Sequence, residues 1–226
     1  MYNVEKNLTR LDYGQPTFFL DSKELNLVKA KLKKNEYKIY YPYPDSEKNI
    51  IYNDKMPEVI LYEIKTKEIL RHQDILGSIY SLNIDSSLFG DIVIINNRYF
   101  VYILKSLRNY FESNLLIIKN THIELLELDI NYLSNYHRSY EKLEFIVSSV
   151  RIDIVISAIC HTGRSNIYNM IKKKEIILNY DLLKEVSYKL KDGDIFSIKR
   201  IGKFKYNGII KSTKSGKCII SIYKYI

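Results

Sequence analysis

The chain has 226 residues, which is room for one large domain or two of ordinary size. Its 46% apolar and 27% charged residues are typical of a globular protein, and no charge-free stretch approaches the roughly 18 residues that span a bilayer. Two cysteines, Cys160 and Cys218, without a C-x-x-C pair, exclude a disulfide framework and a cysteine zinc site. The N-terminus has no apolar signal-peptide core, so we expect a cytoplasmic protein. We also expect no cofactors.

The positive charge is unevenly distributed along the chain. The formal net charge is +9, yet residues 1–145 hold 19 Lys and Arg against 20 Asp and Glu, a net of −1. Residues 146–226 hold 16 against 6, a net of +10. A general compositional bias toward Lys would raise the number of positive charges in both parts of the chain alike. The asymmetry therefore indicates a polyanionic partner, which is nucleic acid or, as the alternative, an anionic membrane surface.

The first 130 residues alternate between strand and helix patterns. Asp21 followed by Glu24 predicts a capped amphipathic helix, and Asn96-Asn97 predicts a short hairpin turn. The remaining patterns predict helices at 71–82 and 104–111 and strands at 37–41, 50–52, 59–64, 91–95, 98–102 and 123–128. This mixed order predicts an α+β domain with a ferredoxin-like sheet.

The basic part of the chain predicts a second, smaller domain. Residues 131–145 are polar and rich in Tyr, which predicts a linker or a bridging strand. Apolar spacing from Ile152 to Ile159 predicts a helix capped by Ser148 or Ser149, and a second helix follows Thr162 or Gly163. Strands are predicted at 175–179, 186–190, 195–198, 204–206 and 218–225. The expected architecture is two helices packed on an antiparallel sheet.

Five short motifs in this part of the chain resemble one known module. In order, they are Arg151-Ile-Asp153, Gly163-Arg164-Ser165, Ile171 with a basic run, Leu178-Asn179 and Gly193-Asp194. The order resembles the small RNA-binding domain named after small-subunit ribosomal protein four, here called the S-four domain. The sequence departs from that pattern at Gly163, where Ser is usual, and at Lys174, where a Gly turn is usual.

Further segments extend the resemblance to the YlmH family of ribosome-associated proteins. They are Phe19-Leu20-Asp21, His72-Gln-Asp74-Ile-Leu-Gly77, Leu82-Asn-Ile84, Phe89-Gly90-Asp91 and Arg200-Ile-Gly202-Lys203-Phe204, with Gln73 where Arg is usual. The resemblance implies a central RRM-like domain, a C-terminal S-four domain and association with large ribosomal subunits that carry peptidyl-tRNA. We therefore expect a lead-in over 1–17, an RRM-like domain over 18–130, a linker over 131–145 and an S-four domain over 146–226.

The candidate site residues are cationic or polar and cluster in the S-four part. Arg164 opens a helix, where free N–H groups and the helix dipole favour phosphate. Arg151 has two open interpretations, RNA contact or bracing, and Asp153 is interpreted as an ion-pair or helix-start residue rather than a catalytic acid. Phe204 and Tyr206 are interpreted as core residues rather than stacking platforms. The predicted RNA-binding residues are Arg151, Arg164, Ser165, Lys172, Lys173, Lys174, Asn179, Arg200, Lys203 and Lys205.

The sequence favours a non-enzymatic, monomeric RNA-binding protein that docks on the large ribosomal subunit. Its expected partners are rRNA and tRNA or peptidyl-tRNA, in quality control of stalled translation, with no membrane. His72 is either a ribosome contact or a structural residue at a helix start. One alternative is an RNA-modifying enzyme, for example pseudouridine synthase-like, with an S-four domain that delivers substrate. Another is an adaptor at the membrane surface or in cell division.

Overall fold

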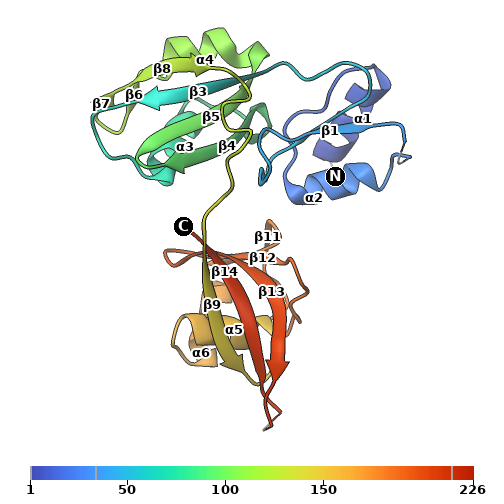
Figure 1. Ribbon diagram of the computed structural model, residues 1–226, viewed down its shortest axis with the longest axis vertical. Helices are drawn as coiled ribbons and strands as arrows, with labels where there is room; N and C mark the ends of the chain where they lie inside the picture. The colour runs from blue at the N-terminus through green and yellow to red at the C-terminus, as the bar shows by residue number, and fades with distance from the viewer. Residues whose placement is uncertain (1, 34, 215) are drawn as a thin grey trace. The chain divides into compact units, whose positions relative to one another are not determined.

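The computed structural model describes residues 2–33, 35–214 and 216–226. The chain forms two compact units, residues 1–137 and 138–226 (Figure 1). The division lies inside the segment 131–145 predicted as a linker, and residues 140–145 of that segment belong to strand β9 (Tyr140–Val147). Unit 1 holds 17 Lys and Arg against 18 Asp and Glu, and unit 2 holds 18 against 8. The positive charge thus follows the structural division, with a net of −1 against +10.

Unit 1 contains a ferredoxin-like sheet. Its strands pair in the order β4-β5-β3-β8, and every pairing is antiparallel. This is the βαββαβ arrangement of RRM-like domains, so the predicted α+β fold is confirmed. Its elements are β3 (Val59–Lys65), α3 (His72–Ser81), η1 (Ser86–Leu88), β4 (Phe89–Ile95), β5 (Arg98–Leu104), η2 (Lys105–Leu107), α4 (Arg108–Asn114), β6 (Ile117–Ile118), β7 (Thr121–His122) and β8 (Glu124–Leu128).

Local signals in unit 1 produce the elements that they predict. Asn96 and Asn97 both have positive φ, 49° and 60°, as the tight turn between β4 and β5 requires. The Asp21 carboxylate accepts a hydrogen bond from the Glu24 N–H, and the Glu24 carboxylate accepts one from the Asp21 N–H, which completes the predicted capping box. The N-terminal elements of unit 1 are α1 (Tyr2–Asp12), α2 (Ser22–Lys29), β1 (Lys38–Tyr40) and β2 (Ile50–Tyr52).

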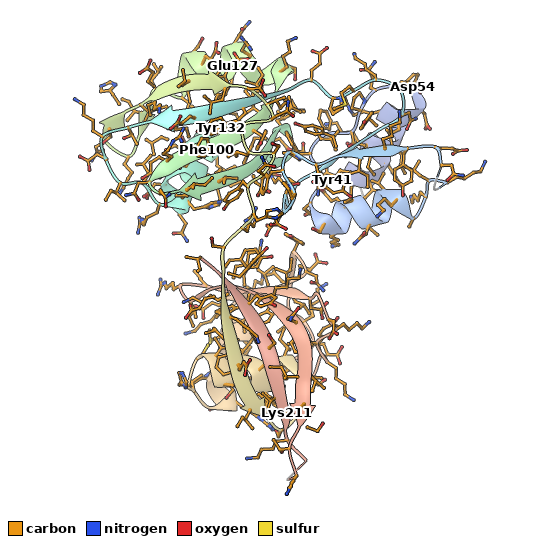
Figure 2. The ribbon with its side chains drawn as sticks, viewed as in Figure 1. Tyr41, Asp54, Phe100, Glu127, Tyr132 and Lys211 are labelled. Atoms are coloured by element: carbon orange, nitrogen blue, oxygen red, sulfur yellow. The ribbon has the colours of Figure 1, made fainter. Side chains whose placement is uncertain are left out.

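Both faces of the sheet in unit 1 are covered by other parts of the unit. One face packs against α3 and α4 through residues such as Tyr62 and Val101. The opposite face, which stacks RNA bases in many RRM domains, carries Phe100 but lies under the chain's own segments. Tyr132 lies over Phe100, with ring centroids 5.8 Å apart, and Leu133 is buried in the same cluster (Figure 2). Base stacking on this face is therefore blocked in the described conformation.

An ion pair fixes the covering segment to the sheet. Arg98 donates two hydrogen bonds to the Glu63 carboxylate, at 2.8 and 2.9 Å, and a third to the Tyr132 hydroxyl at 2.7 Å. Glu63 is buried, and the Lys65 Nζ lies 2.8 Å from the Glu63 Oε1, which also accepts from the Arg98 Nε. These partners lower the pKa of Glu63 to about 2, chiefly through the hydrogen bonds from Arg98.

The stability of unit 1 should depend on pH through Glu63. Because folding lowers the pKa of this carboxyl from 4.5 to about 2, the stabilisation is present above pH 4.5 and is lost as the pH falls toward 2. We expect the unfolding midpoint of the full chain to fall over this interval more steeply than that of a Glu63→Gln variant. Thermal unfolding followed at several pH values measures the difference. Parallel curves for the two proteins would contradict it.

Unit 2 packs two helices against one face of a six-stranded antiparallel sheet, as predicted. The strand order is β11-β10-β12-β13-β14-β9. Helix residues such as Val155 and Ile167 pack against strand residues such as Phe204, Tyr206 and Ile222. The elements are β9, α5 (Ile152–Ile159), α6 (Arg164–Lys172), β10 (Ile176–Leu178), β11 (Asp181–Leu182), β12 (Ile195–Ile198), β13 (Gly202–Ser212) and β14 (Cys218–Tyr225).

Two predictions for unit 2 were wrong. The segment 186–190 is not a strand, because its Tyr188 carbonyl accepts from the Ile152 N–H at 2.8 Å and its Leu190 N–H donates to the Val150 carbonyl. These bonds hold it as a loop against the start of α5, where Lys189 and Arg151 form a single bridge. The N-cap of α5 is Arg151, not Ser148 or Ser149.

Among the described residues, no helix is both long and apolar enough to cross a membrane.

Candidate nucleic-acid interface

Arg164 is the first residue of α6, where the helix presents uncapped backbone donors. The N-cap is Gly163, which has an extended backbone and no side chain to accept from the first turn. The positive end of the helix dipole and these N–H groups favour an anion there. Arg164 and Ser165 are both exposed, so the predicted phosphate-binding position is open to solvent.

A basic stripe continues from Arg164 along the solvent side of α6. Arg164, Tyr168 and Lys172 are spaced by four residues, whereas Ile167 is buried and faces the sheet. The Tyr168 side chain is 48% exposed, and the Lys172 Nζ lies 4.6 Å from the centre of its ring. Sequence reasoning missed Tyr168, although its spacing from Arg164 and Lys172 could have revealed it. The stripe suits RNA, because its cations pair with phosphates and the Tyr168 ring holds the Lys172 ammonium at the surface through a cation–π contact.

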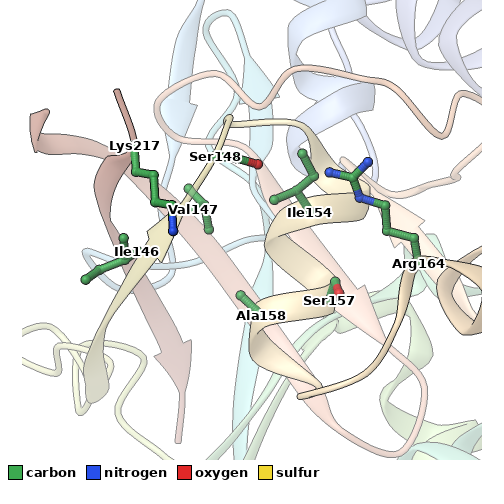
Figure 3. A pocket seen from close by; sticks show the side chains of 8 residues that line it. All are labelled: Ile146, Val147, Ser148, Ile154, Ser157, Ala158, Arg164 and Lys217. Carbon is green, nitrogen blue, oxygen red and sulfur yellow. The ribbon is translucent and has the colours of Figure 1, made fainter. Parts of the chain in front are cut away.

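An open pocket adjoins the N-terminal end of this stripe. Its volume is about 320 Å³, and Figure 3 shows Arg164 and Lys217 on different sides of it. Lys217 comes from the connection between β13 and β14, so sequence spacing could not place it beside Arg164. The two cations give the pocket a positive rim. The remaining lining residues are Ile146, Val147, Ser148, Ile154, Ser157 and Ala158.

The C-terminal end of α6 forms a hydrogen-bonded turn that displays its lysines. The Lys174 N–H donates to the Ile171 carbonyl, and the Glu175 N–H donates to the Met170 carbonyl, the two bonds of a Schellman motif. Lys174 occupies the left-handed position of that motif, with φ of 57°. The geometry explains why a Gly is usual there in S-four domains. The lysine thus adds an exposed charge at a conformational cost.

Replacing Lys174 with Gly should raise stability and weaken RNA binding. Glycine adopts the left-handed conformation without strain, so we expect the free energy of unfolding of unit 2 to rise by about 0.5–1 kcal/mol. Loss of one cation should reduce the salt dependence of RNA binding by roughly 0.7–0.9 in log–log slope if Lys174 meets a phosphate. Denaturant unfolding and RNA titrations at several salt concentrations measure both effects. A less stable Lys174→Gly protein would contradict the strain argument.

Two predicted site residues instead make internal structural pairs. Arg151 donates to both carboxylate oxygens of the buried Asp153, at 3.1 and 3.0 Å, which is the ion pair expected of Asp153. This pair raises the pKa of Arg151. Asn179 donates to the Asp194 carboxylate at 2.8 Å and accepts from the Ile195 N–H at 2.9 Å. Arg151 and Asn179 therefore brace the domain, and we leave them outside the proposed RNA surface.

The remaining predicted cations do not lie on the face of α6. Phe204 and Tyr206 are buried against the helices, as interpreted, so alternation along β13 places Lys203 and Lys205 on the opposite face of the sheet. Arg200 lies exposed in the turn before β13. His72 is the first residue of α3, in the other unit. The predicted RNA-binding cations of unit 2 therefore lie on more than one surface of that unit.

The described residues also bear on whether the chain holds a metal site or an activated cysteine nucleophile. In the part of the chain that the structure describes, no group of three or more His, Cys, Asp or Glu side chains could hold a metal ion. Burial raises the pKa of the Cys160 thiol, which keeps it protonated at neutral pH. A protonated thiol is a poor nucleophile, so the environment of Cys160 does not favour a catalytic role for it.

Parts of the chain are similar to a known domain family, to one curated protein and to one solved structure. The family described as "Putative RNA-binding domain in YlmH" matches residues 56–132, which span β3 to β8 of unit 1. A stretch of 146 residues, 65% of this chain, is 23% identical to Ribosome-associated protein quality control protein P2 of Bacillus subtilis (strain 168). The match spans 57% of that relative's length. Among solved structures, Cell division protein ylmH from Streptococcus pneumoniae aligns over 59% of this chain and 90% of that one, with 21% identity and a TM-score of 0.48.

Proposed function

We propose that this chain, a member of the YlmH family by its domain match and its curated relative, is a cytoplasmic RNA-binding protein that docks on the large ribosomal subunit. The domain match and the relative agree with the resemblance described from the sequence. In this proposal the protein binds rRNA and peptidyl-tRNA during quality control of stalled translation. The name of the Bacillus subtilis relative supports the ribosomal association.

One observation carries the proposal, namely the placement of the positive charge on a defined surface of unit 2. Unit 2 has a net charge of +10, and α6 combines an open N-terminus, Arg164, an exposed Tyr168 and three lysines at its end. Such a surface neutralises phosphates and fits the backbone of helical RNA, which proteins recognise largely by shape. Unit 1, with a net of −1 and a covered sheet face, would contribute selection of the ribosome rather than general affinity for RNA.

Arg164→Glu should weaken binding to RNA and to ribosomal subunits without changing the fold. Loss of a charge-assisted phosphate contact, with repulsion in its place, should cost about 1–3 kcal/mol, or roughly 5- to 150-fold in affinity. Cosedimentation with separated large and small subunits, together with RNA titration, measures the loss. Lys67→Glu, an exposed position in unit 1 with the same change of charge, is the control.

The outcomes separate the proposal from its competitors. Unchanged binding by Arg164→Glu, with an unchanged melting temperature, would contradict the assigned surface. Sedimentation with the small subunit alone would contradict docking on the large one. Mass spectrometry of the bound RNA tests the alternative of an RNA-modifying enzyme, since a changed nucleoside would reveal catalysis.

A further inference from the structure

The outer face of the sheet in unit 2, which faces away from α5 and α6, carries tyrosines and lysines in adjacent rows. Strand pairing places Lys205, Tyr223 and Lys142 side by side across β13, β14 and β9. In the next row Tyr225 pairs with Tyr140. Paired residues of antiparallel strands project from the same face, so these side chains form one surface. We call it the tyrosine–lysine face, and it comprises Tyr140, Tyr223, Tyr225, Lys142, Lys203 and Lys205.

The rings of this face contact one another and a cation. The Tyr140 ring centre lies 5.8 Å from that of Tyr223 and 5.1 Å from that of Tyr225. The Lys203 Nζ lies 5.0 Å from the Tyr225 ring centre and 5.2 Å from that of Tyr180, which follows β10. The three tyrosines of the face are half-buried, so each is held by its neighbours and still reaches solvent. Such rings are pre-oriented and lose little conformational entropy when a flat ligand stacks on them.

The charge on this face favours an anionic ligand with flat groups. Lys203 and Lys205 flank the rings, and on the same face the Lys142 Nζ lies 2.9 Å from the Glu144 carboxylate. Single-stranded RNA combines the two chemistries, because its unpaired bases stack on aromatic rings while its phosphates meet cations. A duplex keeps its bases stacked on one another, so the α6 surface suits it better.

We propose that the tyrosine–lysine face is a second RNA site, which holds unpaired bases while α6 binds helical RNA. The inference rests on the proposed RNA-binding function and adds to it the class of RNA that this face takes. Tyr223 and Tyr225 stack on bases, and Lys203 and Lys205 contact the adjoining phosphates. The protein would thereby select RNA in which a helix adjoins a single-stranded segment.

The test compares two RNA probes on the full chain. They are an oligouridine strand of roughly 12 nucleotides and an RNA duplex of the same length. Replacing both Tyr223 and Tyr225 with Leu keeps apolar bulk but removes the aromatic rings. We expect this variant to bind the single strand roughly tenfold or more weakly, with the duplex affinity changed less than about twofold. The matching Phe variant should bind both probes as the unchanged protein does, and Tyr13→Leu, an 80% exposed tyrosine of unit 1, is the control.

Each result bears on one proposal. Single-strand binding that is unchanged in the Leu variant, or lost equally in the Phe variant, would overturn base stacking on this face. In that case a duplex affinity that still falls with Arg164→Glu would leave the proposed function intact. Failure of the unchanged protein to bind either RNA would instead contradict the proposed function itself. Crosslinks from a 4-thiouridine strand should map to β14 if the inference holds, and to unit 1 if it does not.

Discussion

A fragment of residues 138–226 is expected to fold alone, whereas a fragment that begins at residue 146 is expected to be largely unfolded. The difference is most of β9, which contributes six of the eight residue pairs with β14. Leu143 and Phe145 also pack against the core of unit 2. Both side chains are partly buried, so the loss of each should cost about 1–2 kcal/mol. The loss of the six strand pairs adds to this, against a total stability of about 5–15 kcal/mol for a domain.

Circular dichroism and thermal unfolding of the two fragments measure this difference. The longer fragment should melt cooperatively, and the shorter one should show weak β signal and no sharp transition. Limited proteolysis of the full chain gives an independent check, with first cleavage expected at 134–139, between the buried Leu133 and the start of β9. Cooperative melting of the 146–226 fragment at the same temperature would show that β9 is dispensable.

Most elements could be predicted because their signals are local. The Asp21 capping box, the Asn96-Asn97 turn and the strand Cys218–Tyr225 all follow from residues close in sequence. Residues 131–145 were predicted as a linker or a bridging strand, because the polar residues Tyr140, Lys142 and Glu144 on the solvent face obscure the strand pattern of β9. Its identity depends on pairing with β14, about 80 residues later, and no local pattern encodes such a pairing.

The site was less predictable than the fold, because several residues of the S-four motifs contact one another inside the domain. Arg151 and Asp153 bind each other, and so do Asn179 and Asp194, which joins two motifs that lie 15 residues apart. Motifs of this kind identify the domain but not the residues that touch RNA. The contact surface depends on which face of the sheet each side chain occupies and on how the chain folds back. Lys203 and Lys205 lie on the face away from α6, whereas Lys217 lines the same pocket as Arg164.

Most of the general RNA affinity is expected to reside in unit 2. A 138–226 fragment, with a net charge of +10, should bind structured RNA nearly as well as the full chain, whereas a 1–137 fragment, with a net of −1, should bind poorly. The difference in net charge accounts for the contrast, because phosphates are attracted to the strongly basic unit 2 and not to the nearly neutral unit 1.

The salt dependence of RNA binding tests that prediction quantitatively. The cations around α6, namely Arg164, Lys172, Lys173, Lys174 and Lys217, can neutralise about three to five phosphates, which corresponds to a log–log slope of roughly −2 to −4.5. Between about 50 and 300 mM salt, the affinity of the 138–226 fragment should therefore fall by roughly 40- to 3,000-fold. Titrations at four or more salt concentrations, on this fragment and on its Arg164→Glu variant, give the slopes. The log–log slope of the variant should be less steep by roughly 0.7–0.9, the contribution of one phosphate contact. A nearly flat dependence, or tighter binding by the 1–137 fragment, would move the RNA site to unit 1, where the covering segment around Tyr132 would then have to leave the sheet to expose Phe100.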